Sequence, residues 1–387
     1  MGMYTAERQR AMPYLQRVSG PLYEHWYLLH HRLVRVVSNR PALLEQVRSF
    51  LYYAELVADY TYDDPTALPT EIPLDLLWEV GQNVHRPVAL TCYLFETAPG
   101  EAFPPPPGLP RPESIEWSEI SGINGPLRAR WKRDDFRFRE FQAYEGVCSR
   151  VVSVLHKSDL YATIFIEDLA RCQPWFLMRF VFYMVLGTMY GCNGFEVIHA
   201  AAVDQENAAA LLIGEPGSGK STLVLSCLEA EMNLLADDVL FFAKDDGVMR
   251  VYAFPEDIGV RKGIFELLDA EFLRTVTEDR RQKRFVDVQR HFQRQVVSSS
   301  PIRLLLFMKE EQRGPAFRVE RLSMAQTVSQ LIQEYISNEE VPAEEAAVMF
   351  DAFTDLAAQA PGYLLWLSPD TRENARQVRA LLAEHRR

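Results

Sequence analysis

A glycine-rich segment in the middle of the chain carries residue types that bind phosphate. It completes the pattern G-x-x-x-x-G-K-[ST] and comprises Gly214, Glu215, Pro216, Gly217, Ser218, Gly219, Lys220 and Ser221. Its three glycines allow backbone conformations that a side chain would forbid, so successive N–H groups can turn inward around an anion. The pattern predicts a loop that cradles the phosphates of a nucleotide triphosphate. The alternative is a glycine-rich turn that binds nothing.

The segments on either side of this loop have the patterns that such a loop requires. The apolar run 208–213 predicts a buried strand, and residues 221–231 predict a helix whose positive N-terminal end faces the same anion. We then expect the Lys220 ammonium to reach the β- and γ-phosphate oxygens, the Ser221 hydroxyl to bind Mg²⁺ and the Thr222 hydroxyl to contact the α-phosphate. ATP and Mg²⁺ are therefore the expected ligands.

Two adjacent acids and one histidine are the other candidates for chemistry. Asp237 and Asp238 follow the short apolar run 233–235, and His199 lies in a predicted strand over 195–203. A carboxylate pair at a strand end can hold a metal ion and accept the proton of an attacking hydroxyl. We assign both duties to the pair jointly, because the sequence does not say which acid does which. A solvated turn is the alternative for the acids, and a structural role in the core is the alternative for His199.

The order of these elements, a histidine, the loop and then the Asp237-Asp238 pair, resembles the HPr kinase/phosphorylase superfamily. That superfamily includes the HPr-kinase-related peptide kinases found with lasso-peptide biosynthesis, and the chain is more distantly similar to phosphoenolpyruvate carboxykinase. The resemblance covers about 195–263 and extends loosely to the C-terminus. It implies an α/β fold with a mixed-sheet phosphate-loop core, ATP-dependent phosphorylation of a serine hydroxyl, a role for His199 beside the transferring phosphate or the carboxylates, and a homo-oligomer.

The segment 254–263 departs from the resemblance. It occupies the place of the family signature E-[IV]-R-G-x-G but matches it poorly. Within it, Glu256 is a candidate metal carboxylate and Arg261 a candidate phosphate clamp, with surface charge as the alternative for each; Lys283 and Arg284 are weaker candidates. The departure favours a hydroxyl-bearing peptide, protein or small metabolite as the acceptor over the HPr protein. An ATP-binding regulatory module with little turnover is the alternative function, and a carboxykinase is disfavoured because its arginine and lysine set is missing.

The composition excludes several classes of protein. A net charge of -12, from 53 acidic and 41 basic residues, argues against nucleic-acid binding. Five scattered cysteines suggest neither a disulfide framework nor a zinc site, and the N-terminus has no apolar signal core, so we expect a cytoplasmic protein. The apolar stretch 175–190 is shorter than the roughly 20 residues that span a bilayer, and it predicts a buried helix beginning near Pro174 rather than a membrane anchor.

The chain is expected to form two domains. Residues 1–143 predict an α+β domain with strands over 26–37 and 87–95 and a helix over 41–54, and we expect it to recognise the substrate or regulate the enzyme. Residues 144–387 predict the kinase domain. The proline-rich segment 103–112 predicts either a stiff surface connector or a segment that binds a partner. In the run 127–139, basic residues alternate with apolar ones, which predicts a hairpin whose basic face is either solvated or docks a peptide or an anion.

Overall fold

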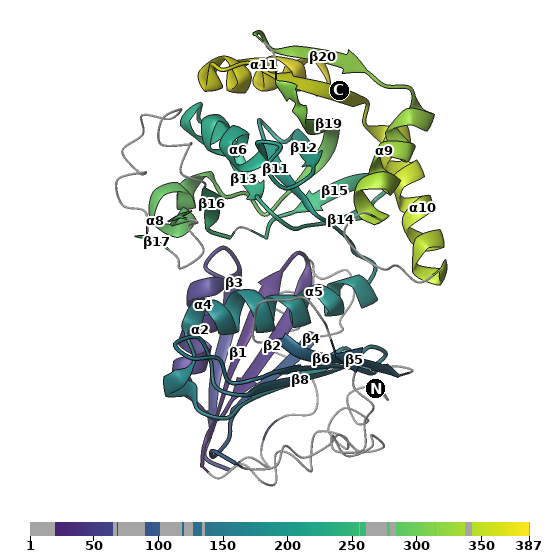
Figure 1. The fold of residues 1–387 in the computed structure, drawn as a ribbon. Coiled ribbons are helices and arrows are strands. Elements are labelled where there is room, and N and C mark those ends of the chain that lie inside the picture. Colours follow the sequence, from purple (N-terminus) through teal and green to yellow (C-terminus); the bar gives the residue numbers. More distant parts are fainter. Residues whose placement is uncertain are drawn as a thin grey trace. The chain divides into compact units, whose positions relative to one another are not determined.

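The computed structural model describes residues 20–64, 68, 90–100, 118–119, 127–133, 136–254, 256–260, 277–278, 284–313, 315–336 and 343–386. The chain divides into two compact units, Met1–Asn193 and Gly194–Arg387 (Figure 1). The boundary therefore lies about fifty residues beyond the 143/144 position expected from the sequence. The reason is strand pairing, because β8 (Val151–His156) and β9 (Tyr161–Ile166) hydrogen-bond to strands of the N-terminal sheet.

The N-terminal unit is built on one nine-stranded sheet. Its order is β3-β1-β2-β4-β9-β8-β7-β6-β5. The strands not yet given are β1 (Leu22–Leu29), β2 (Arg32–Ser38), β3 (Glu55–Tyr62), β4 (Leu90–Glu96), β5 (Ser118–Glu119), β6 (Leu127–Arg133) and β7 (Phe136–Phe141). The antiparallel β6–β7 pair confirms the hairpin predicted over 127–139, and the proline-rich segment 103–112 lies outside the described residues.

The single strand expected over 26–37 is in fact a hairpin. His30 and His31, with φ angles of 52° and 57°, form the turn between β1 and β2. Two consecutive residues with positive φ give a tight turn whose twist matches the twist of the flanking strands. The sequence did not predict this turn, because histidine is not a usual residue at turn positions.

Two helical segments cover one face of the N-terminal sheet. They are α2 (Pro41–Phe50) and a continuous run formed by α4 (Pro174–Phe176), the π-helix η4 (Leu177–Phe182) and α5 (Tyr183–Cys192), which follows the short 3-10 helix η3 (Leu169–Arg171). Phe50 of α2 makes edge-to-face ring contacts with Phe182 and Tyr183, and the Cys92 thiol of β4 lies 3.7 Å from the Met189 sulfur. The helix predicted to begin near Pro174 is confirmed. In the described part of the chain, no helix has the length and apolar character needed to cross a bilayer.

The C-terminal unit contains a second nine-stranded sheet, and this sheet is mixed. Seven strands follow the order β10-β14-β15-β19-β12-β11-β13, with β21 beside β19 and β20 beside β21. They are β10 (Glu196–Ile198), β11 (Ala200–Asp204), β12 (Ala209–Gly214), β13 (Asn233–Ala236), β14 (Leu240–Asp245), β15 (Val248–Tyr252), β19 (Ser299–Arg313), β20 (Arg318–Arg321) and β21 (Gly362–Leu367). Because β12 is parallel to β19 and antiparallel to β11, the expectation of a mixed α/β sheet is confirmed. Strands β16 (Ile258–Val260), β17 (Thr277–Glu278) and β18 (Arg284–Val286) form a small separate sheet.

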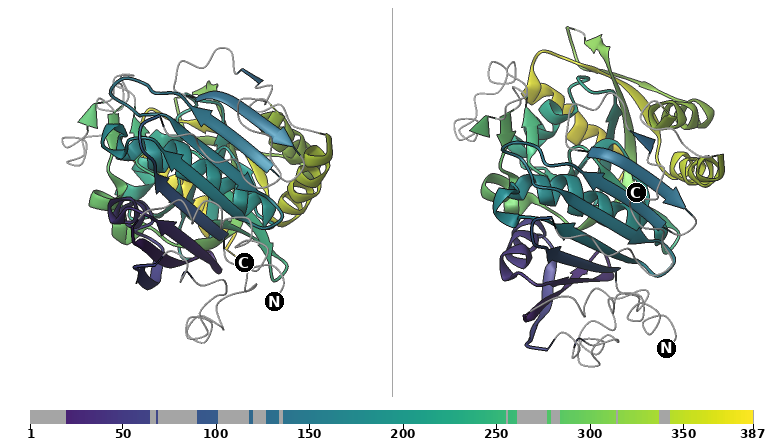
Figure 2. Two further views of the ribbon diagram at one scale, coloured as in Figure 1. Left: turned by 90° about the horizontal axis from the view of Figure 1, so that it is seen from below. Right: turned by 60° about the horizontal axis from the view of Figure 1, so that its bottom comes forward.

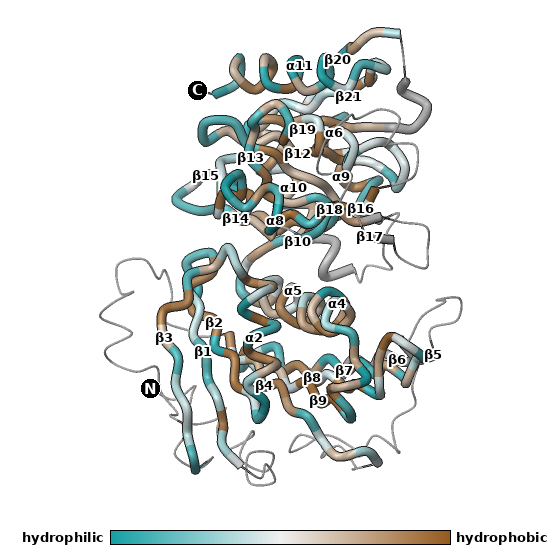
Figure 3. Tube along the Cα trace, turned by 90° about the vertical axis from the view of Figure 1, so that its left-hand side faces the viewer, coloured by the Kyte–Doolittle hydropathy of each residue, from teal (hydrophilic) through white to brown (hydrophobic). Residues whose placement is uncertain are grey.

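Helices pack on both faces of this mixed sheet (Figures 1 and 2). On one side lie α6 (Lys220–Glu229) and α11 (Thr371–Glu384), and on the other lie α9 (Met324–Ile336) and α10 (Ala343–Gln359); α8 (Val288–Phe292) and η6 (Gln293–Gln295) precede β19. Alternate β12 residues Leu211 and Ile213 join the core that contains Leu331 of α9 and Phe353 of α10. The central strands are accordingly among the brown, apolar parts of the tube in Figure 3. Burial of each such side chain stabilises the fold by about 1.5–3 kcal/mol.

One glutamine ties α10 to the sheet. The Gln359 amide nitrogen donates to the backbone carbonyls of Met249 on β15 and Ile302 on β19, both at 2.9 Å. Its side-chain oxygen accepts from the Met249 N–H at 2.6 Å. All the hydrogen-bonding groups of this side chain are thus used to hold the helix to two neighbouring strands.

The substitution Gln359→Ala is expected to lower the free energy of unfolding by about 1–3 kcal/mol, because it leaves three backbone groups at the helix–sheet interface without this partner. Urea denaturation followed by circular dichroism measures the change. The matched control is Gln377→Ala on the exposed side of α11, where we expect a change within about 0.5 kcal/mol. Equal stabilities of the two variants would contradict the role of Gln359.

Candidate nucleotide-binding site

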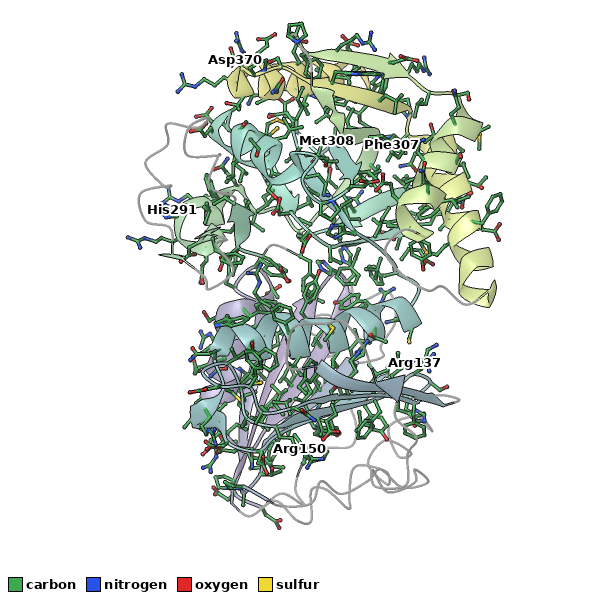
Figure 4. All side chains as sticks on the ribbon, viewed as in Figure 1. Arg137, Arg150, His291, Phe307, Met308 and Asp370 are labelled. Atoms are coloured by element: carbon green, nitrogen blue, oxygen red, sulfur yellow. The ribbon has the colours of Figure 1, made fainter. Side chains whose placement is uncertain are left out.

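The glycine-rich loop lies between the end of β12 and the start of α6, as expected from the sequence. A Cβ atom on Gly214 would overlap the backbone carbonyl oxygen of Met308 on β19, which is labelled in Figure 4. Gly219 precedes the first residue of α6 with φ of 105°, a conformation that side chains rarely adopt. Parallel pairing of β12 with β19 therefore requires glycine at one end of the loop, and the helix start requires it at the other.

The side chain of Lys220 folds back onto its own loop. The residue is only 7% exposed, and its ammonium donates to the backbone carbonyls of Gly214 and Glu215. Burial lowers the pKa of Lys220, and four carboxylates oppose that shift. They belong to Asp238, Asp237, Glu334 and Glu215. The loop lysine is thus surrounded by negative charge.

Asp237 is a buried carboxylate joined to the first turn of α6. The Ser221 hydroxyl donates to its Oδ2 atom at 2.9 Å, and the residue is 6% exposed. Its Oδ1 atom is buried and accepts no hydrogen bond from the described residues. Burial raises the pKa of Asp237 to about 7, with further increases from Asp238 and Glu256, while the Ser221 hydrogen bond and Lys220 act in the opposite direction. A buried carboxylate oxygen without a donor fits a cation as its partner.

Asp238 lies in a different environment from its neighbour. Its side chain is 63% exposed, and its Oδ1 atom lies 3.2 Å from Nδ1 of His199, whose side chain is 28% exposed. The structure therefore brings His199 and Asp238 together at the surface and separates them from the buried oxygen of Asp237. Adjacent acids in such different surroundings can serve different chemical purposes.

These residues meet where the chain changes from one set of paired strands to another. The strand expected over 195–203 is divided at His199, because β10 pairs with β14 whereas β11 pairs with β12 and β13. Asp237 and Asp238 lie at the matching crossover from β13 to β14. Ala200 is paired with Ile213 and Ala202 with Ala236, so the end of β13, the start of β11 and the phosphate loop lie at one edge of the sheet.

The other expected site residues are placed as follows. Glu256 is half-buried before β16, and its charge acts on Asp237. Glu215 and Pro216 are exposed at the loop tip, Gly217 is half-buried with φ of 100°, and Thr222 is half-buried in the first turn of α6. Ser218 is buried, and its hydroxyl has no hydrogen-bond partner among the described residues. Arg261 and Lys283 lie outside the described residues, as does the side chain of Arg284 on β18.

Sequence reasoning missed two contributors to the site. Glu334 of α9 is buried and acts electrostatically on Lys220, and Met308 supplies the carbonyl that requires glycine at 214. Neither residue belongs to a motif, and both come from segments more than eighty positions beyond the loop. The described residues contain no group of three or more His, Cys, Asp or Glu side chains that could hold a metal ion. A site with one or two side-chain ligands completed by substrate phosphates is the common arrangement for Mg²⁺.

Comparisons with known proteins add little to this description. No family model and no curated protein matches the chain. Among solved structures, the HPr(Ser) kinase/phosphatase from Coxiella burnetii is similar with a TM-score of 0.29 and 16% sequence identity, over 49% of this chain and 90% of that chain. A likeness of this size supports no statement about activity, which must be argued from the site itself.

Removing the charge of Asp237 is expected to stabilise the metal-free protein. The pKa of this carboxyl is raised from 3.8 to about 7 by folding, so the group destabilises the fold progressively as the pH rises from about 4 to 7. We expect Asp237→Asn to increase the free energy of unfolding by about 1–4 kcal/mol at pH 8 and by less at pH 5. Urea denaturation in EDTA at both pH values measures this, with Asp355→Asn, at an exposed helix position, as the control. A difference that does not change with pH would contradict the assignment.

Proposed function

We propose that the chain is an ATP-dependent phosphotransferase whose acceptor is a hydroxyl group, as in a serine kinase. The observation that carries the proposal is the meeting of three features at one sheet edge of the C-terminal unit. These are the phosphate loop, the buried carboxylate of Asp237 and the exposed pair formed by Asp238 and His199. The loop alone supports nucleotide binding, and the exposed carboxylate beside it supports transfer.

The loop and the start of α6 would bind the triphosphate. Backbone N–H groups at a helix N-terminus favour negative charge, and those of the Gly214–Ser221 segment would surround the same anion. Lys220 would exchange the carbonyls of Gly214 and Glu215 for β- and γ-phosphate oxygens. The surrounding carboxylates oppose the lowering of the Lys220 pKa that burial causes.

The residues present fit a magnesium ion. The Ser221 hydroxyl and the partnerless Oδ1 of Asp237 would hold it, with Glu256 near enough to affect the same carboxylate. When bound, Mg²⁺ neutralises phosphate charge and orients the γ-phosphoryl group. This assigns metal binding to Asp237 and leaves Asp238 for the acceptor.

Asp238 is the better placed of the two acids to act as the general base. An exposed carboxylate can reach an acceptor hydroxyl that approaches from solvent, and the contact with His199 Nδ1 at 3.2 Å orients it. In the transfer, the acceptor oxygen forms a bond to the γ-phosphorus while the bond to the bridging oxygen breaks, ADP leaves and Asp238 takes the hydroxyl proton.

The acceptor is a peptide, another protein or a small metabolite. A homo-oligomer, a cytoplasmic location and the absence of nucleic-acid and membrane partners remain predictions.

Asp238→Asn is expected to lower phosphoryl transfer by about 10²–10⁴-fold while ATP still binds, because only the base is removed. Labelled γ-phosphate from ATP, supplied with Mg²⁺ and a panel of serine-containing peptides, measures transfer, and calorimetry measures binding. Asp355→Asn is the matched control and should retain full activity. Lys220→Ala should lose binding as well as transfer.

Two results would contradict the proposal. Full transfer by Asp238→Asn would remove the proposed base. Tight ATP binding without phosphate transfer to any acceptor, and without ADP release, would instead favour an ATP-binding regulatory module.

A further inference from the structure

A second candidate site lies entirely within the N-terminal unit. A cavity of about 210 Å³ is formed between β1, β3 and α2. Pairing of β1 with β3 sets His25 opposite Asp59 and Tyr23 opposite Thr61, and α2 contributes Glu45. The cavity is smaller than the roughly 300–1,000 Å³ of sites for drug-sized ligands, so it suits one group of side-chain size.

The charges around this cavity favour a cation. Glu45 and Asp59 approach from different elements, and both act electrostatically on His25, as does Arg48 one turn further along α2. Burial lowers the pKa of His25 below its ordinary value of 6.5, which disfavours a positive charge on the ring, and its Nδ1 atom lies 3.1 Å from the Tyr27 hydroxyl. The carboxylates of Glu45 and Asp59 and the guanidinium of Arg48 together give a net negative charge at the cavity.

We propose that this cavity binds a single organic cation, a guanidinium or ammonium group, between the carboxylates of Glu45 and Asp59. Carboxylates on two walls allow charge-assisted hydrogen bonds to both edges of a planar guanidinium, and Tyr23 lines the same cavity. A metal ion that needs three protein side chains as ligands, such as structural zinc, is disfavoured, since the described residues hold no such group. The proposal is independent of the phosphotransferase function.

The cation belongs either to a peptide or to a free metabolite, and the sheet edge offers a way to distinguish them. Strand β3 ends the strand order and, among the described residues, pairs only with β1. An extended peptide that paired with this edge strand would form backbone hydrogen bonds to it. A peptide would gain affinity from that edge, whereas a free amine or guanidine would not.

Calorimetry with N-acetyl-arginine amide and its neutral isostere N-acetyl-citrulline amide tests the site. We expect the arginine compound to bind at least about tenfold more tightly, and Glu45→Gln and Asp59→Asn each to weaken it about five- to thirtyfold. Glu55→Gln, an exposed acid on β3 that does not line the cavity, and Lys220→Ala should leave this affinity unchanged. Circular dichroism confirms that each variant folds.

The remaining outcomes decide the proposal and the source of the cation. No heat with the arginine compound at millimolar concentration, equal binding of both compounds, or unchanged affinity in both cavity variants would overturn it. Given binding, a tetrapeptide with arginine among β-branched residues that binds at least about tenfold more tightly than the single residue identifies a peptide ligand. Equal affinity of the tetrapeptide and agmatine identifies a free cationic metabolite.

Discussion

The hydrogen bond from Ser221 to Asp237 is the contact on which the candidate site depends. It joins the first turn of α6 to the crossover after β13, and it holds a carboxylate out of water beside Lys220. A buried carboxylate is costly unless its oxygens have partners, and here only one oxygen has a donor in the described residues. Folding thus buries the Asp237 carboxylate at an energetic cost, and a bound cation with its phosphate chain would offset that cost.

The separation of two adjacent acids follows from the same arrangement. The chain turns from β13 towards β14 at Asp237-Asp238, so one side chain is directed into the sheet edge and the other towards solvent. In the interior an uncompensated charge interacts strongly with its neighbours, whereas at the surface water screens it. In the proposed function the buried carboxylate holds the metal ion and the exposed one takes the proton, although their sequence positions are equivalent.

In the N-terminal unit, charged side chains lie on the edge strand of the sheet. Its inner strands are apolar, and α2 and α5 cover one face, while β3 at the end of the sheet carries exposed acids. Exposed charge on an edge strand discourages pairing with other copies of the chain. At Asp59 this charge also lies across the strand pair from His25 and near Glu45, which is why protection of the edge and recognition of a cation coincide there.

Local patterns in the sequence determined the glycine-rich loop, the flanking strand and helix, the β6–β7 hairpin and the helix from Pro174, because each follows from nearest-neighbour periodicity and turn chemistry. Tertiary structure alone decided the break at His199, the different burial of Asp237 and Asp238, the boundary after Asn193 and the cavity beside His25. These features depend on which distant strands pair and in what register, and pairing is set by packing between segments far apart in the chain rather than by the preferences of the residues themselves.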